Sequence, residues 1–96
     1  MTEDVMQQAL RVPDDVLWQR LPDGESVFLN LRTEEYFGLD ATGTEMWEVL
    51  SSSATLGDAR GRLLAIYDTT PDVIERDLLG LVDRLVARGL LAVGAP

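Results

Sequence analysis

A short β-type run ends at an aspartate and passes directly into a helical pattern, and this junction constrains the fold more than any other feature of the chain. Residues 34–39 read EEYFGL, and Asp40 separates them from the helix-like residues 41–50. Aspartate is a preferred N-cap residue, because its carboxylate accepts hydrogen bonds from free N–H groups of the first helical turn. The sequence therefore predicts a strand joined to a helix without a linker.

Two polar turns divide the preceding region into β-type segments. Val16–Leu21 is rich in Val, Leu and Trp, and the turn residues Pro, Asp and Gly follow at 22–24. Glu25–Leu31 is a second segment, and a polar turn at 32–34 leads into Tyr36–Leu39. β-rich segments separated by short polar turns are typical of consecutive hairpins. We therefore expect a three-stranded antiparallel meander.

The alternation within these strands predicts which face of the sheet is buried. Every second residue of a strand points to the same side. Val27, Leu29 and Leu31 alternate at this period in the central segment. The predicted core face comprises Leu17, Leu29, Leu31, Phe37 and Leu39, and the opposite face comprises Trp18, Phe28, Asn30, Tyr36 and Gly38.

The rest of the chain reads as three helices, each with a start and a stop signal. The first runs from the Asp40 cap to the serines at 51–53, the second begins at Thr55, and the third runs from Thr70-Pro71 to Arg88-Gly89. Ser, Thr or Asp before a helix, proline at its first position and glycine after its end are the usual terminal residues. The predicted fold class is α+β, a three-stranded antiparallel sheet followed by three helices.

The third helix carries a wider apolar surface than packing on one neighbour requires. Ile74, Leu78, Leu81 and Leu85 form one stripe, which Leu79, Val82 and Val86 widen. Either the domain buries two sides of this helix, or one side receives a partner. A short meander leaves an open strand edge, and such an edge beside an apolar helix forms a groove for an extended peptide.

Composition excludes most chemistry and several classes of partner. The chain has 96 residues, enough for one domain, with eight arginines, no lysine, seventeen acidic residues and a net charge of −9. This charge disfavours nucleic acid and anionic membrane. Histidine and cysteine are absent, which removes the commonest general base and metal ligands. We therefore expect no enzyme activity, no catalytic residue, no cofactor and no metal. The sequence has no apolar segment long enough to span a membrane and no basic start of a signal peptide, so we expect a cytoplasmic protein.

The N-terminal region is polar. Residues 1–11 have only Val5, Met6 and Leu10 as apolar anchors, so we expect this segment to be a flexible lead-in. The folded domain is expected at residues 12–93.

Several of these elements together resemble the PqqD-like family. The resemblance lies in the hairpin ending Leu29-Asn30-Leu31, the run Tyr36 to Asp40, Thr42-Gly43, Trp47, Tyr67-Asp68 and Arg88-Gly89-Leu90-Leu91. Members of this family serve as recognition elements for ribosomally made precursor peptides. At this length the chain is most similar to the free-standing leader-binding protein of lasso peptide biosynthesis. The resemblance implies a winged-helix-like arrangement and a role in delivering the precursor to a separate leader peptidase and cyclase.

The resemblance also implies where a leader peptide binds. The leader adds as a further strand to the third strand, against the third helix, and many leaders carry a Tyr-x-x-Pro element. Carried over to this sequence, the peptide-binding residues are Glu35, Tyr36, Phe37, Gly38 and Leu39 on the strand, and Ile74, Asp77, Leu78, Leu81, Val82, Arg84 and Leu85 on the helix. Asp77 and Arg84 are equally compatible with ordinary solvated helix charges. We expect Trp18 and Trp47 in the core or partly covering it.

Three other functions stay open. The same groove would serve a winged-helix-type interaction or regulatory module that binds a folded partner. A winged-helix arrangement also allows DNA binding through the third helix, but Glu75, Asp77 and Asp83 there offset the arginines and leave no basic stripe. An enzyme subunit is the weakest alternative.

Overall fold

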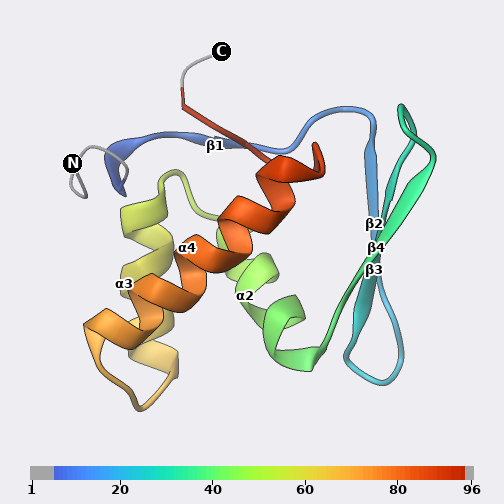
Figure 1. Cartoon of the computed structure of the whole chain (residues 1–96). Helices are drawn as coiled ribbons and strands as arrows, with labels where there is room; N and C mark the ends of the chain where they lie inside the picture. Colours follow the sequence, from blue (N-terminus) through green and yellow to red (C-terminus); the bar gives the residue numbers. More distant parts are fainter. Residues whose placement is uncertain (1–5, 95–96) are drawn as a thin grey trace.

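The structure of the chain is a computed structural model that describes residues 6–94. Along the sequence, the strands and helices are β1 (Leu10–Arg11), β2 (Val16–Arg20), β3 (Ser26–Asn30), β4 (Glu35–Leu39), α2 (Ala41–Ser51), α3 (Leu56–Ile66), α4 (Pro71–Ala87) and β5 (Ala92–Val93). Figure 1 shows the β2–β4 sheet on one side of the molecule and the three helices gathered on the other. The predicted α+β class, with three strands followed by three helices, is confirmed.

The sheet is the predicted antiparallel meander. Its strand order is β2-β3-β4, so β2 and β4 are the edge strands. Gly24 in the first turn has a φ of 92°, a left-handed conformation that glycine adopts without steric cost. Glu34 at the end of the second turn has a φ of 61°.

The helices begin where the capping residues predicted. Asp40 Oδ1 accepts a hydrogen bond from Gly43 N at 2.8 Å, and Thr55 Oγ1 accepts one from Asp58 N at 3.1 Å. Thr70 caps α4 in the same way. Each cap satisfies a backbone N–H that has no partner within the helix.

The predicted core face is wrong for Leu17, Leu29 and Leu31, and right for Phe37 and Leu39. The register aligns Trp18, Phe28 and Phe37 on the face that packs against the helices, and Leu17, Leu29 and Tyr36 on the outer face. Phe28 is fully buried, whereas Leu17 is 54% exposed and Leu31, in the following turn, is 51% exposed.

Polar residues at buried positions explain this error. Ser26 and Asn30 flank Phe28 on the core face of β3, and both are 2% exposed. Their side chains are hydrogen-bonded, Ser26 to Thr44 at 2.7 Å and Asn30 to the backbone oxygen of Arg88 at 2.9 Å. A buried polar group is tolerated when it is hydrogen-bonded. Apolar alternation alone therefore selected the outer face, where Val27 and Leu29 lie.

Aromatic rings join the sheet to α2. The Phe28 and Trp47 rings meet edge to face with their centroids 4.8 Å apart, a favourable arrangement for two aromatic rings. Trp47 is 2% exposed, as expected for a core residue, and Trp18 is partly buried against the same cluster.

The wide apolar surface of α4 is buried by the domain itself. Its buried residues are Ile74, Leu78, Leu81, Val82 and Leu85. Leu79 is partly buried against this core, and Val86 is 44% exposed. Most of the helix surface that suggested a partner is therefore part of the core.

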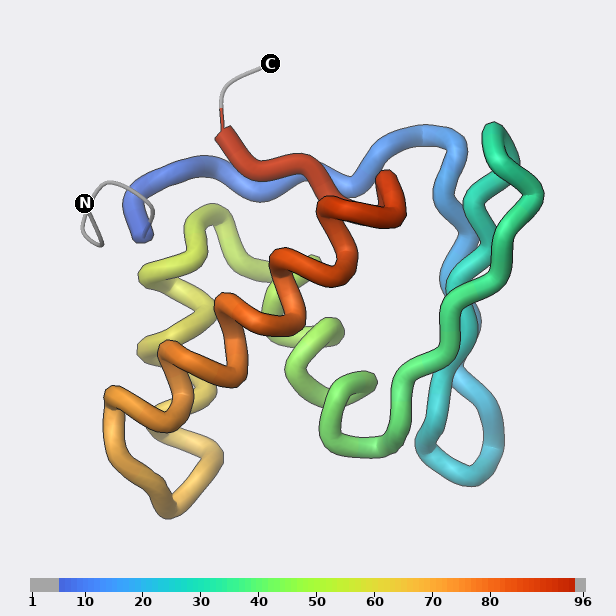
Figure 2. The backbone as a smooth tube through the Cα atoms, in the orientation of Figure 1, coloured from blue at the N-terminus to red at the C-terminus, as the bar shows by residue number. Residues whose placement is uncertain are grey.

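Residues 6–11, which belong to the expected lead-in, contact the rest of the protein through the buried Met6 and through backbone pairing. Met6 is 3% exposed, and β1 pairs antiparallel with β5, with Leu10 opposite Val93. Figure 2 shows these two terminal segments running side by side above the helices. A pairing partner so distant in sequence leaves no local signal. Residues 1–5, which include Val5, lie outside the described residues.

Candidate functional site

The edge of β4 is open. Within residues 6–94, β4 pairs with β3 on one side and no strand pairs with its other side. An edge strand presents unpaired backbone N–H and C=O groups, to which an extended peptide can add as a further strand.

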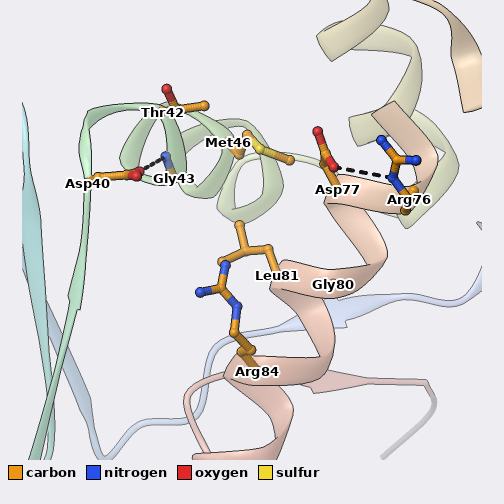
Figure 3. A pocket seen from close by; sticks show the side chains of 9 residues that line it. All are labelled: Asp40, Thr42, Gly43, Met46, Arg76, Asp77, Gly80, Leu81 and Arg84. Carbon is orange, nitrogen blue, oxygen red and sulfur yellow. Dashed lines mark hydrogen bonds and ion pairs between the residues drawn. The ribbon is translucent and has the colours of Figure 1, made fainter. Parts of the chain in front are cut away.

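A pocket of about 560 Å³ lies where β4 passes into α2, between the first turn of α2 and one side of α4. We call it the α2–α4 pocket, and Figure 3 shows the side chains that line it. These are Asp40, Thr42, Gly43, Met46, Arg76, Asp77, Gly80, Leu81 and Arg84.

Gly80 leaves one position of α4 beside this pocket without a side chain. A Cβ at Gly80 would meet no other atom within 4 Å. Glycine inside a helix costs about 0.5–1 kcal/mol relative to alanine. Gly80 therefore leaves space on the pocket side of α4 at a cost in helix stability.

A second pocket of about 230 Å³ adjoins the first and shares Thr42, Met46 and Asp77 with it. Its remaining lining residues are Tyr67, Asp68, Thr69, Val73 and Ile74. The Tyr67 hydroxyl donates a hydrogen bond to Glu45 of α2. Burial and this carboxylate raise the pKa of Tyr67 from 10.0 to about 12. The hydrogen bond ties the end of α3 to α2 beside the second pocket.

Charged groups mark the two ends of the space between β4 and α4. At the end nearer α2, the Arg76 Nε lies 3.8 Å from an Asp77 oxygen. At the other end, the Arg88 guanidinium lies over the Phe37 ring, 5.2 Å from its centroid. This stacking is a cation–π contact. Arg84 lies between these ends, on the wall of the α2–α4 pocket.

The structure separates the strand residues proposed for the site into two faces. Glu35, Phe37 and Leu39 share the face of β4 that looks toward the helices, whereas Tyr36 and Gly38 share the outer face. Tyr36 is 69% exposed there. A peptide strand on β4 would meet the backbone of all five residues, but only Phe37 and Leu39 would offer it apolar side chains on the helix side.

The residues proposed on α4 also fall into two groups. Asp77, Leu81 and Arg84 line the α2–α4 pocket, and Ile74 and Asp77 line the second pocket. Leu78, Val82 and Leu85 are buried in the core and line neither pocket. Their place in a peptide site stays a prediction.

Sequence reasoning missed part of the pocket. Met46 and Thr42 come from α2, which lies far from α4 in sequence, and no local pattern connects the two helices. Gly80 does carry a signal, because it stands alone inside a strongly helical pattern, where glycine lowers helix stability.

No group of three or more Asp, Glu, His or Cys side chains within residues 6–94 is arranged to hold a metal ion. Among the helices of this region, none has the length and apolarity to cross a membrane.

The fold and its open strand edge place the protein in a class of small winged-helix-like α+β domains. A family model described as coenzyme PQQ synthesis protein D (PqqD) matches residues 25–91, well over half of the chain. The chain belongs to the PqqD family, as the sequence motifs predicted.

Two solved structures are similar to the chain over most of its length. TbiB1 in complex with the TbiA(beta) leader peptide is 32% identical in sequence with a TM-score of 0.76, and the match covers 84% of this chain and 93% of that one. A lasso peptide synthetase B1 complexed with the leader peptide is 24% identical with a TM-score of 0.75, covering 88% of this chain and 98% of that one. No curated protein matches the chain significantly.

Proposed function

We propose that this protein is a non-catalytic adaptor of lasso peptide biosynthesis. It binds the leader segment of a ribosomally synthesised precursor peptide by β-strand addition to β4, and presents the precursor to a leader peptidase and a cyclase. The observation that carries the proposal is the open edge of β4 beside the α2–α4 pocket. The similarity to TbiB1, whose structure contains a leader peptide, supports it.

In the proposed complex, both the backbone of β4 and the side chains of the pockets contribute to peptide binding. Ladder hydrogen bonds to β4 supply affinity for almost any extended sequence, so the pockets must supply selectivity. The α2–α4 pocket offers apolar surface from Met46 and Leu81. Burial of an aromatic or aliphatic anchor here would remove apolar surface from water on both partners.

Presentation to an enzyme needs a second surface that stays free when the leader is bound. The outer face of the sheet fits this need, because Leu17 and Tyr36 are exposed there and point away from α4. Leu17, Leu29 and Tyr36 stand in register across this face, and contiguous apolar surface of this kind is a feature of protein–protein contact sites. The peptidase and cyclase thus have a surface to approach while the groove is occupied.

The binding step is tested with a displayed random-peptide library selected on the immobilised protein. Binding of a selected peptide, measured by calorimetry, should protect the β4 amides from hydrogen exchange. Gly80→Phe should abolish binding, because the ring fills the space that the glycine leaves in the pocket. Gly61→Phe is the matched control, since Gly61 is also a mid-helix glycine with no atom within 4 Å of an added Cβ, but it lies on α3 away from β4.

The two variants separate the proposal from a simple effect on folding. Both place a ring on an exposed helix surface, so thermal melts should show both proteins folded. Peptide binding that survives Gly80→Phe, or exchange protection that falls elsewhere than β4, would count against the proposed site.

The presentation step has its own test. Leu17→Glu should leave peptide affinity unchanged and slow leader removal by the peptidase of the same pathway. Equal processing rates with the parent and the variant would exclude the outer face as the docking surface.

A further inference from the structure

Arg84 of α4 and Arg88, the C-cap residue of the same helix, lie beside the strand edge without a carboxylate partner in residues 6–94. Arg88 stacks on Phe37 of β4, and Arg84, one turn earlier in α4, lines the α2–α4 pocket. Figure 3 shows the Arg84 side chain extending alongside Leu81 into this pocket. Within residues 6–94, neither guanidinium has a carboxylate oxygen within 4.0 Å.

The chain has seventeen acidic residues and eight arginines. Within residues 6–94, three of these arginines, Arg20, Arg60 and Arg76, have a carboxylate oxygen within 4.0 Å. Arg20 lies 2.9 Å from Glu48, and Arg60 lies 3.5 Å from Glu75. Arg11, Arg32 and Arg62 also lack such a partner in residues 6–94, but Arg84 and Arg88 differ from them in lying beside the open edge of β4 and the α2–α4 pocket.

Asp40 and Asp77 line the α2–α4 pocket together with Arg84, but neither carboxylate forms an ion pair with Arg84 or Arg88. Asp40 caps α2 through Gly43, and Asp77 lies beside Arg76. Glu35 shares the helix-facing side of β4 with Phe37, but it is exposed and makes no ion pair with Arg88.

The alternation of side chains along a strand predicts which residue of a bound peptide would lie next to Arg88. In a strand added to β4, the residue opposite Phe37 can point to the helix side of the sheet, where the Arg88 guanidinium lies over the ring. The next residue on that side, two positions along the peptide, lies opposite Leu39. Leu39 precedes Asp40, which lines the α2–α4 pocket with the apolar Met46 and Leu81, so this peptide residue would lie at the pocket.

We infer that the peptide strand recognised by this protein carries an acidic residue opposite Phe37, held by Arg88 with Arg84 beside it, and an apolar residue two positions away in the α2–α4 pocket. The inference rests on the proposed function and names the chemistry of its ligand. Stacking on Phe37 holds the Arg88 guanidinium plane in place and leaves its N–H edge free to bind a carboxylate. Because ladder hydrogen bonds form in either strand direction, the acidic residue would also fix the direction in which the peptide lies.

The test uses the displayed random-peptide library. Peptides selected on the parent protein should be enriched in Asp or Glu at a position two residues from an apolar or aromatic residue. For a selected peptide, Arg88→Gln should weaken binding about tenfold, the loss expected for one charge-assisted hydrogen bond. Arg84→Gln should weaken binding less, and Arg20→Gln, at the opposite edge of the sheet, should leave affinity unchanged.

A charge exchange shows that the effect is a direct pairing. The selected peptide with its acidic residue replaced by arginine should bind Arg88→Glu more tightly than it binds the parent. A thermal melt of each variant establishes that loss of the Arg88–Phe37 contact has not unfolded the protein.

The outcomes separate this inference from the proposed function. Selected peptides that protect β4 but show no acidic preference, with affinity unchanged in Arg84→Gln and Arg88→Gln, would overturn the inference and leave peptide binding intact. Failure to select any peptide that protects β4 from hydrogen exchange would overturn both.

Discussion

Asn30 of the central strand donates a hydrogen bond from Nδ2 to the backbone oxygen of Arg88 at 2.9 Å. Its Oδ1 accepts from the backbone N–H of Arg32 at 3.0 Å. One buried amide therefore joins the sheet to the C-terminal end of α4 and also shapes the turn into β4. Since β4 and α4 are the two walls of the proposed groove, Asn30 sets their spacing at this end without touching a ligand.

Replacement of Asn30 should destabilise the fold. Asn30→Leu keeps the branching of the side chain but leaves the Arg88 carbonyl and the turn amide without partners, at a cost of about 2 kcal/mol or more. Urea unfolding measures this loss. Gln19→Leu, at an exposed position on β2, is the control and should change stability by less than about 0.5 kcal/mol. Equal stability of the two variants would show that the Asn30 hydrogen bonds contribute nothing.

The Ser26–Thr44 pair predicts a strongly non-additive double mutant. Each hydroxyl is buried and the two oxygens are 2.7 Å apart. Ser26→Ala or Thr44→Val alone leaves a buried hydroxyl unsatisfied, at about 1–2 kcal/mol each, whereas the double variant replaces both partners and should cost little more than either single change. A double-mutant cycle from denaturant unfolding measures the coupling, and additive losses would contradict it.

These buried polar residues also mark the limit of the sequence reasoning. The helix starts at Asp40, Thr55 and Thr70 were predictable because a cap acts on residues within its own turn. The buried face of β3 was not, because Ser26 and Asn30 are satisfied by Thr44 and Arg88, which lie in other elements. A partner so distant in sequence leaves no periodic signal.

The distance in sequence between contacting residues also explains which residues of the site could be predicted. Asp77, Leu81 and Arg84 were named because the family resemblance assigns the third helix to the peptide, and all three line the α2–α4 pocket. Their contact with a peptide stays a prediction. Met46 and Thr42 of the pocket were missed because only the packing of α2 beside α4 brings them there. The Arg88–Phe37 contact likewise depends on how α4 lies against the sheet.

The corrected assignment of the sheet faces gives a direct contrast between two residues. Phe28 is fully buried, so Phe28→Ala should cost about 3–5 kcal/mol. Leu17 is 54% exposed on the outer face, and Leu17→Ala should change stability by less than about 1 kcal/mol. Thermal or urea unfolding of both variants checks the contrast. A large loss of stability in Leu17→Ala would contradict this contrast and would support the face assignment made from alternation.

The final prediction concerns alkaline pH. The pKa of Tyr67 is raised from 10.0 to about 12, chiefly by burial and further by the hydrogen bond to Glu45. A raised pKa in the folded state means that the unfolded chain loses the phenol proton first. The stability that this proton maintains is therefore complete below pH 10 and is lost as the pH rises toward 12.

Tyr67→Phe should remove this dependence, because phenylalanine has no proton to lose. The free energy of unfolding of the parent should decline between pH 10 and 12, and that of the variant should decline less steeply. The chain has no lysine or cysteine, so few other side chains titrate in this range. Tyr36→Phe, at a position 69% exposed, is the matched control and should retain the slope of the parent. Urea unfolding at stepped pH values measures all three proteins, and an equally steep decline in Tyr67→Phe would show that the alkaline loss of stability arises from another group.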